Sequence, residues 1–68
     1  MPSKLELAKE LFSVNAKARE LGASAIAALE IAKETTTMET VQNALRAIDE
    51  YRLVRNEYLE RLNAWETN

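Results

Sequence analysis

The sequence of 68 residues lacks both cysteine and histidine. The absence of cysteine excludes disulfide cross-links, and the absence of both residue types removes the usual ligand sets for zinc and iron–sulfur clusters. Catalytic sets of the Ser/His/Asp or Cys/His kind cannot form without histidine. A single glycine also excludes a glycine-rich loop that would bind phosphates. We therefore expect no cofactor, no bound metal and no enzymatic activity.

A strong charge of one sign and long apolar runs are also absent. The net charge is −2, and acidic and basic residues are interspersed, which argues against an electrostatic surface for nucleic acid or anionic lipid. The longest apolar stretch, Leu21–Ala32, is shorter than the roughly 20 apolar residues that span a bilayer. The segment Met1–Lys4 has no apolar signal region. These features predict a cytoplasmic protein that does not bind membranes.

Two capping motifs stand out in a sequence that has only one glycine and one proline to interrupt its helices. The run Ser3–Glu6 matches the capping box S/T-x-x-E, in which each end satisfies a free backbone N–H. A second box, Thr36–Glu39, follows Thr35, and three consecutive threonines favour a cap over a helix interior. We predict a single domain over 1–68, with a helix over about 4–34, a turn over about 35–37 and a helix over about 38–65.

Both predicted helices carry apolar stripes with alternating spacings of three and four residues. The first helix carries the stripe Leu7, Leu11, Val14, Ala18, Leu21, Ala25, Ala28 and Ala32. The second helix carries Val41, Ala44, Ile48, Tyr51, Arg55, Tyr58, Leu62 and Trp65, flanked by Met38, Leu45 and Leu59. Such seams are typical of coiled coils. The predicted fold is an all-α, antiparallel two-helix coiled-coil hairpin in which Tyr51 faces Gly22 and Trp65 faces Leu7.

The first helix has a second apolar stripe on its far side, which cannot face the same partner helix. Small chains without disulfides or metals need another source of stability, and association is the one that remains. We therefore predict that two hairpins assemble into a homodimeric four-helix bundle. The predicted oligomer interface consists of Phe12, Ala16, Ala23, Ile26 and Ala27.

One charged residue interrupts the apolar stripe of the second helix. Arg55 lies near the middle of that stripe, and the antiparallel register places it close to Asn15. We interpret this pair as a polar core layer that fixes the register and the oligomeric state, as single polar core residues do in coiled coils. Two alternatives are that Arg55 holds a carboxylate or phosphate of a ligand or partner, and that it extends into solvent.

The function that best fits these features is association with another protein, as an adaptor, regulator, inhibitor or assembly chaperone. The predicted partner-binding residues are Arg52, Arg55, Tyr58 and Trp65, because tyrosine, tryptophan and arginine are enriched at interfaces. One alternative is a nucleic-acid-binding four-helix bundle, which the acidic balance of the second helix makes unfavourable. Another is a purely structural piece, either a designed bundle or a subunit of a larger assembly.

Short runs of the second helix resemble two known kinds of helical hairpin. The run Leu53–Tyr58 is similar to one in the small phycobilisome-degradation adaptors, although the order of Asn and Glu differs. That resemblance implies contacts with a phycobiliprotein and a protease chaperone. The runs Ala44–Arg46 and Arg55–Leu62 resemble the closing helix of a hairpin from the outer-membrane efflux (TolC-like) family, without its glycine-containing connector. Neither resemblance assigns the chain to a family.

Overall fold

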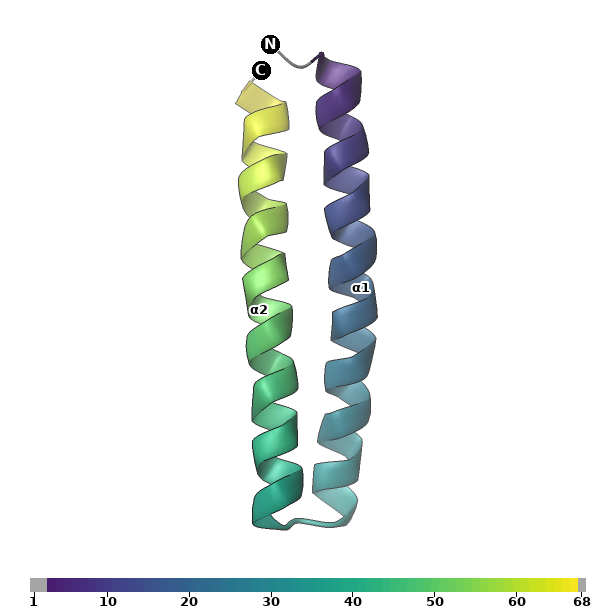
Figure 1. The fold of residues 1–68 in the computed structure, drawn as a ribbon, viewed down its shortest axis with the longest axis vertical. Helices are drawn as coiled ribbons and strands as arrows, with labels where there is room; N and C mark the ends of the chain where they lie inside the picture. The colour runs from purple at the N-terminus through teal and green to yellow at the C-terminus, as the bar shows by residue number, and fades with distance from the viewer. Residues whose placement is uncertain (1–2, 68) are drawn as a thin grey trace.

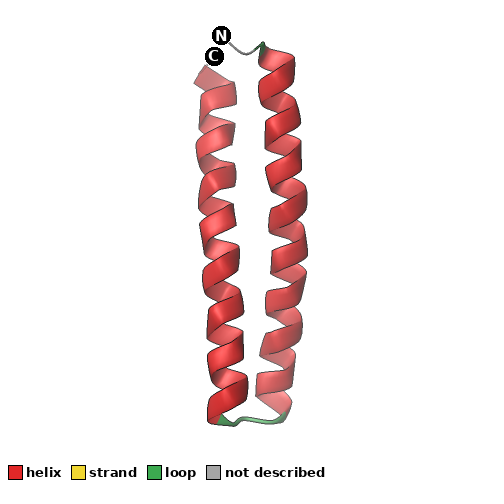
Figure 2. Ribbon diagram, viewed as in Figure 1, coloured by secondary structure: helices red, strands yellow, loops and turns green. Residues whose placement is uncertain are grey.

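The computed structural model describes residues 3–67 as two long helices joined by a short turn. Helix α1 spans Lys4–Glu34 and helix α2 spans Met38–Thr67. The helices run antiparallel, so that the start of α1 and the end of α2 lie side by side (Figure 1). The described residues contain no strand (Figure 2), and the Cα trace measures 49 × 13 × 13 Å. The predicted all-α hairpin is confirmed, with α2 ending at Thr67 rather than at residue 65.

Helix α1 begins and ends with the hydrogen bonds that its terminal residues predict. At the start, the Ser3 hydroxyl accepts a hydrogen bond from the backbone N–H of Glu6 at 3.2 Å, which satisfies one of the free N–H groups of the first turn. At the end, the Thr36 hydroxyl donates to the Ala32 carbonyl at 2.7 Å. The backbone N–H of Thr35 donates to the Ile31 carbonyl at 2.8 Å. Polar side chains therefore replace the missing helical partners at both ends.

The cap of α2 differs from the predicted box. The prediction paired Thr36 with Glu39, whereas the structure pairs Thr37 with Thr40. The Thr37 hydroxyl accepts from the Thr40 N–H at 3.1 Å, and the Thr40 hydroxyl accepts from the Thr37 N–H at 2.9 Å. The Thr40 hydroxyl also donates to the Thr35 carbonyl at 2.7 Å. Because α2 begins at Met38, the residue before it is Thr37, and the short hydroxyl of Thr40 performs the reciprocal role usually given to Glu or Gln.

The contact between the helices follows the predicted stripes, with one exception. Every residue of the α1 stripe is buried or half-buried, and so is every residue of the α2 stripe except Arg55, which is exposed. Val54, one residue earlier, is buried in its place. The buried residues of the whole hairpin are all apolar: Leu11, Ala18, Ala25, Ala44 and Val54. Since three of these five are alanines, the two helices alone form a thin core.

We predict that the Thr37–Thr40 cap stabilises the hairpin through its hydroxyl groups. Thr40→Val keeps the side-chain shape but removes an acceptor and a donor, so the free energy of unfolding should fall by about 1–2 kcal/mol. Urea unfolding at a fixed protein concentration measures this change. Thr35→Val is the matched control, because no hydrogen bond involves the Thr35 hydroxyl within residues 3–67. An equal loss in both variants would contradict the role of the cap.

Candidate interaction surface

Nine large apolar side chains of the hairpin are exposed: Leu5, Phe12, Ile26, Leu29, Ile31, Met38, Leu45, Leu53 and Leu59. Several recur at a spacing of seven residues, which is close to two helical turns and returns to the same side of a helix. On α1 this row contains Leu5, Phe12 and Ile26, with Arg19 between the last two. On α2 it contains Met38, Leu45 and Leu59, with Arg52 between the last two.

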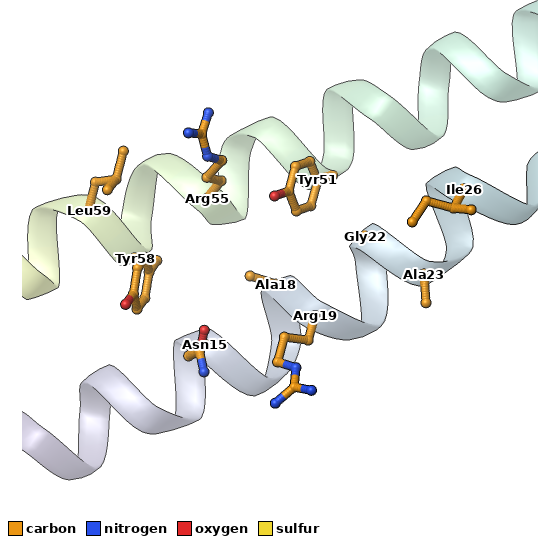
Figure 3. Close-up of a pocket in the computed structure, with 10 residues that line it drawn as sticks. All are labelled: Asn15, Ala18, Arg19, Gly22, Ala23, Ile26, Tyr51, Arg55, Tyr58 and Leu59. Atoms are coloured by element: carbon orange, nitrogen blue, oxygen red, sulfur yellow. The ribbon is translucent and has the colours of Figure 1, made fainter. Parts of the chain in front are cut away.

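Two adjoining grooves lie between these rows. The larger groove has a volume of about 490 Å³ and is lined by residues from the middle of both helices (Figure 3): Asn15, Ala18, Arg19, Gly22, Ala23, Ile26, Tyr51, Arg55, Tyr58 and Leu59. The second has a volume of about 310 Å³ and is lined by Gly22, Ala25, Ile26, Leu29, Ile48 and Tyr51. Because the two share Gly22, Ile26 and Tyr51, they form one continuous depression on one side of the hairpin.

We call this side the groove face, defined as the groove-lining residues together with the rows that continue them. On α1, Arg19 and Ile26 line the larger groove, their row continues to Phe12 and Leu5, and Leu29 lines the second groove. On α2, Leu59 lines the larger groove, and its row continues to Leu45 and Met38. The groove face therefore holds all of the exposed large apolar residues except Ile31 and Leu53.

The floor of the depression is formed where Tyr51 packs on Gly22. Gly22 does not have a positive φ angle, so its backbone conformation does not require glycine. A Cβ atom at this position would lie 3.2 Å from the Cε1 atom of Tyr51, which is tighter than ordinary van der Waals contact. Glycine is therefore needed for the close approach of the tyrosine ring, and this contact confirms that Tyr51 faces Gly22. Missing side-chain volume at Gly22 also deepens both grooves.

Three arginines cross the groove face near its middle, and we call them the arginine belt: Arg19, Arg52 and Arg55. Arg19 and Arg55 line the larger groove from opposite helices, and their guanidinium groups point away from one another (Figure 3). No acidic residue lines either groove. The ion pairs found within residues 3–67 involve a different arginine, Arg61, which lies 2.6 Å from Glu10 and 3.8 Å from Glu57.

The structure brings parts of the two predicted surfaces to the same side. Phe12 and Ile26, from the predicted oligomer interface, share the groove face with the predicted partner-binding residues Arg52, Arg55 and Tyr58. Ala23 lines the edge of the larger groove. Ala16 and Ala27 are exposed on α1 but line neither groove.

Trp65 lies at the end of the hairpin, away from the grooves. It is half-buried, and the Lys4 ammonium lies 4.5 Å from the centroid of its ring. This distance is typical of a cation–π contact. The Trp65 ring therefore contacts the Lys4 side chain in the first turn of α1 rather than standing free in solvent. The predicted pairing of Trp65 with Leu7 stays a prediction.

The polar core layer predicted from Asn15 and Arg55 is not part of the core of the hairpin. Both residues line the larger groove, but Arg55 is exposed and Asn15 is half-buried. No polar or charged residue is buried within residues 3–67. In the single hairpin the neighbouring Val54 is buried instead of Arg55, because burying an unpaired charge is costly. The polar layer was predicted for the assembled oligomer and stays a prediction. A polar layer containing Arg55 would require a second hairpin over the groove.

Sequence reasoning missed Arg19, Leu29 and Leu59 as parts of this surface. The signal that could have found Arg19 is its spacing of seven residues from both Phe12 and Ile26. Leu59 was placed beside the apolar stripe of the second helix, but its row was not joined to the far stripe of the first helix. In an antiparallel pair, corresponding flanks of the two helices meet on one side of the hairpin, and this rule connects the rows.

Comparisons of the chain with protein-family models, with curated proteins and with solved structures find no match. The two resemblances of short α2 runs therefore gain no support from sequence or fold. Within the described residues, neither helix contains a stretch that is both long and apolar enough to cross a membrane.

We predict that the Gly22–Tyr51 contact cancels most of the usual benefit of replacing a helical glycine. Gly→Ala inside a helix ordinarily stabilises by about 1 kcal/mol, but in Gly22→Ala the tyrosine ring must move to admit the new Cβ. We expect a gain below about 0.5 kcal/mol in the native background and the full gain in a Tyr51→Leu background. Thermal or urea unfolding of the four proteins measures this coupling. Equal gains in both backgrounds would show that the contact is not restrictive.

Proposed function

We propose that this hairpin is a non-enzymatic, cytoplasmic association protein whose groove face packs against other helices, with a second copy completing a homodimeric four-helix bundle. The observation that carries the proposal is the concentration of exposed large apolar residues on one face. Contiguous apolar surface of this kind marks interaction sites in proteins that do not aggregate. The opposite side carries the Arg61 ion pairs with Glu10 and Glu57, which favour contact with solvent.

The exposed area of the hairpin supports a second copy. A compact monomer of 7.7 kDa has an accessible surface of about 4,300 Å², whereas the hairpin exposes 5391 Å². The excess of about 1,000 Å² exceeds the roughly 800 Å² that each partner buries in a standard interface. Pairing two groove faces would therefore bring the exposed surface of each chain into the range of an ordinary folded protein.

The shape of the groove face also suits another pair of helices. Ala18, Gly22 and Ala23 leave the middle of the depression open. Ile26, which lines both grooves, is 60% exposed, and Phe12, in the same row of α1, is 67% exposed. Small residues facing large ones allow helices to interdigitate at close range. Each hairpin thus supplies both the side chains that insert and the space that receives them, as a two-fold symmetric interface requires.

A protein partner would use the same face. The predicted partner-binding residues Arg52, Arg55 and Tyr58 share it with Phe12 and Ile26, so the second copy and a partner compete for one surface. We propose that the partner displaces the second copy, which fits an adaptor, a regulator, an inhibitor or an assembly chaperone. In this arrangement the groove face is buried in the dimer interface until a partner binds.

We predict that a lysine on the groove face breaks the dimer, whereas the same change on the other side does not. Ile26 and Ile31 allow a matched comparison because they lie on one helix with exposures of 60% and 58%. Ile26→Lys should raise the dissociation constant of the dimer about 100-fold, because an ammonium group in the groove that Arg19 and Arg55 line replaces an apolar contact and adds a like charge. Ile31→Lys should leave it unchanged. Size-exclusion chromatography with light scattering over a concentration series reports the mass, expected at twice 7.7 kDa for the unaltered chain.

Two results would contradict the proposal. A mass of 7.7 kDa for the unaltered chain at every concentration would exclude self-association. A dimer that is broken by Ile31→Lys and preserved in Ile26→Lys would place the interface on the opposite side of the hairpin.

A further inference from the structure

The arginine belt lies at mid-length of the hairpin. Arg19 is the central residue of α1 (Lys4–Glu34), and Arg52 and Arg55 lie at or next to the centre of α2 (Met38–Thr67). Because the helices are antiparallel, these three residues share one level along the long axis. Apolar residues of the groove face extend from this level toward both ends. The same spacing of seven residues reaches Lys33 at the turn end of the row on α1 and Glu66 at the open end of the row on α2. The face is thus mainly apolar on either side of a cationic middle.

Symmetry fixes what happens to the belt when two groove faces meet. A two-fold axis that pairs the faces over their full length runs either along the helices or across them at mid-length. An axis along the helices places each point along one hairpin opposite the same point of the other copy. An axis across the helices places each end of one hairpin opposite the other end of its copy, but the middle of one still faces the middle of the other. In both arrangements the belt of one copy lies against the belt of the other.

Nothing in the grooves neutralises these charges. The residues that line them include no carboxylate, and the ion pairs found within residues 3–67 are those of Arg61 with Glu10 and Glu57. The grooves instead offer further hydrogen-bond donors near the belt, from the Asn15 amide and from the hydroxyls of Tyr51 and Tyr58. Guanidinium groups with neutral donors and no acid between them are a chemical environment that suits a multivalent oxyanion.

We propose that the dimer binds a phosphate-type oxyanion between the arginine belts of its two copies, and that this anion strengthens the dimer. The inference rests on the proposed self-association, because neither copy alone holds both belts. Outward-pointing guanidinium groups in the single hairpin (Figure 3) turn toward the anion when the second copy brings its own belt. By linkage, an anion that binds the dimer more tightly than the monomer must shift the equilibrium toward the dimer.

The test is a titration of the dimer with sodium phosphate at low millimolar concentration against sodium chloride of the same ionic strength. We expect phosphate to lower the dissociation constant of the dimer about tenfold, within the usual range of coupling between two binding events. Sedimentation equilibrium or light scattering measures this constant. Ribose 5-phosphate in a parallel titration distinguishes the source: strengthening by both compounds indicates a site for terminal phosphate esters, and strengthening by inorganic phosphate alone indicates a site closed around the free ion.

Matched variants separate this site from the general effect of phosphate, which strengthens apolar burial in any protein. Arg19→Gln with Arg55→Gln should abolish the specific response at low millimolar phosphate and tighten the dimer in chloride. Lys17→Gln with Arg46→Gln removes the same charge from exposed positions on the two helices that line neither groove. This control pair should keep the phosphate response of the unaltered chain.

The outcomes distinguish failure of this inference from failure of the proposed function. A dimer with the same dissociation constant in phosphate and chloride would overturn the anion site while leaving self-association intact. A dimer whose phosphate response survives Arg19→Gln with Arg55→Gln would overturn the role of the belt. A chain that stays monomeric in every buffer would overturn the proposed self-association itself.

Discussion

The rest of the structure depends on the small amount of apolar surface that two helices can bury against each other. Alanine at Ala18, Ala25 and Ala44 lets the backbones approach, but each alanine removes little area from water. Within residues 3–67, no large side chain is fully buried. Hydrophobic burial within one chain is therefore modest, and the large apolar residues that would normally form a core stand instead on the groove face. The exposed apolar surface of the groove face is therefore a direct consequence of the small core between the two helices.

The alignment of the helices is set by size complementarity and by the turn acting together. Tyr51 packs on Gly22, so a large residue of α2 meets the smallest residue of α1, and the Trp65 ring lies against the Lys4 ammonium in the first turn of α1. At the other end, the Thr40 hydroxyl ties Thr35 and Thr37 to the start of α2. Sliding one helix along the other by a turn would break both the ring contact and the cap. A fixed alignment is what brings Arg19 and Arg55 to the same level and makes the arginine belt a structural feature.

The hairpin could be predicted from the sequence because its signals are local: caps, a threonine turn and apolar spacings within each helix. The inward position of Arg55 could not, because Val54 and Arg55 differ by one step of about 100° around the helix, and a stripe with alternating spacings accepts either. Only the opposing helix decides between them. The groove face was missed for a related reason. The groove face combines one row of residues from each helix, and neither row is unusual on a single helix. The antiparallel packing of the two helices is what places both rows on one side.

The distribution of charge decides which side of the hairpin can carry an interface. Around Arg61, two carboxylates accompany one guanidinium group, so a second copy against that flank would desolvate acidic groups and would gain fewer large apolar contacts, since Ile31 and Leu53 are the exposed large apolar residues outside the groove face. On the groove face, the three arginines of the belt cluster at mid-length, and large apolar residues lie on either side of them. The proposed association would gain from hydrophobic burial along much of the face and would be opposed by like charges at the belt. In a chain with a net charge of −2, this local excess of arginine would make the strength of the proposed association depend on the group that neutralises the belt.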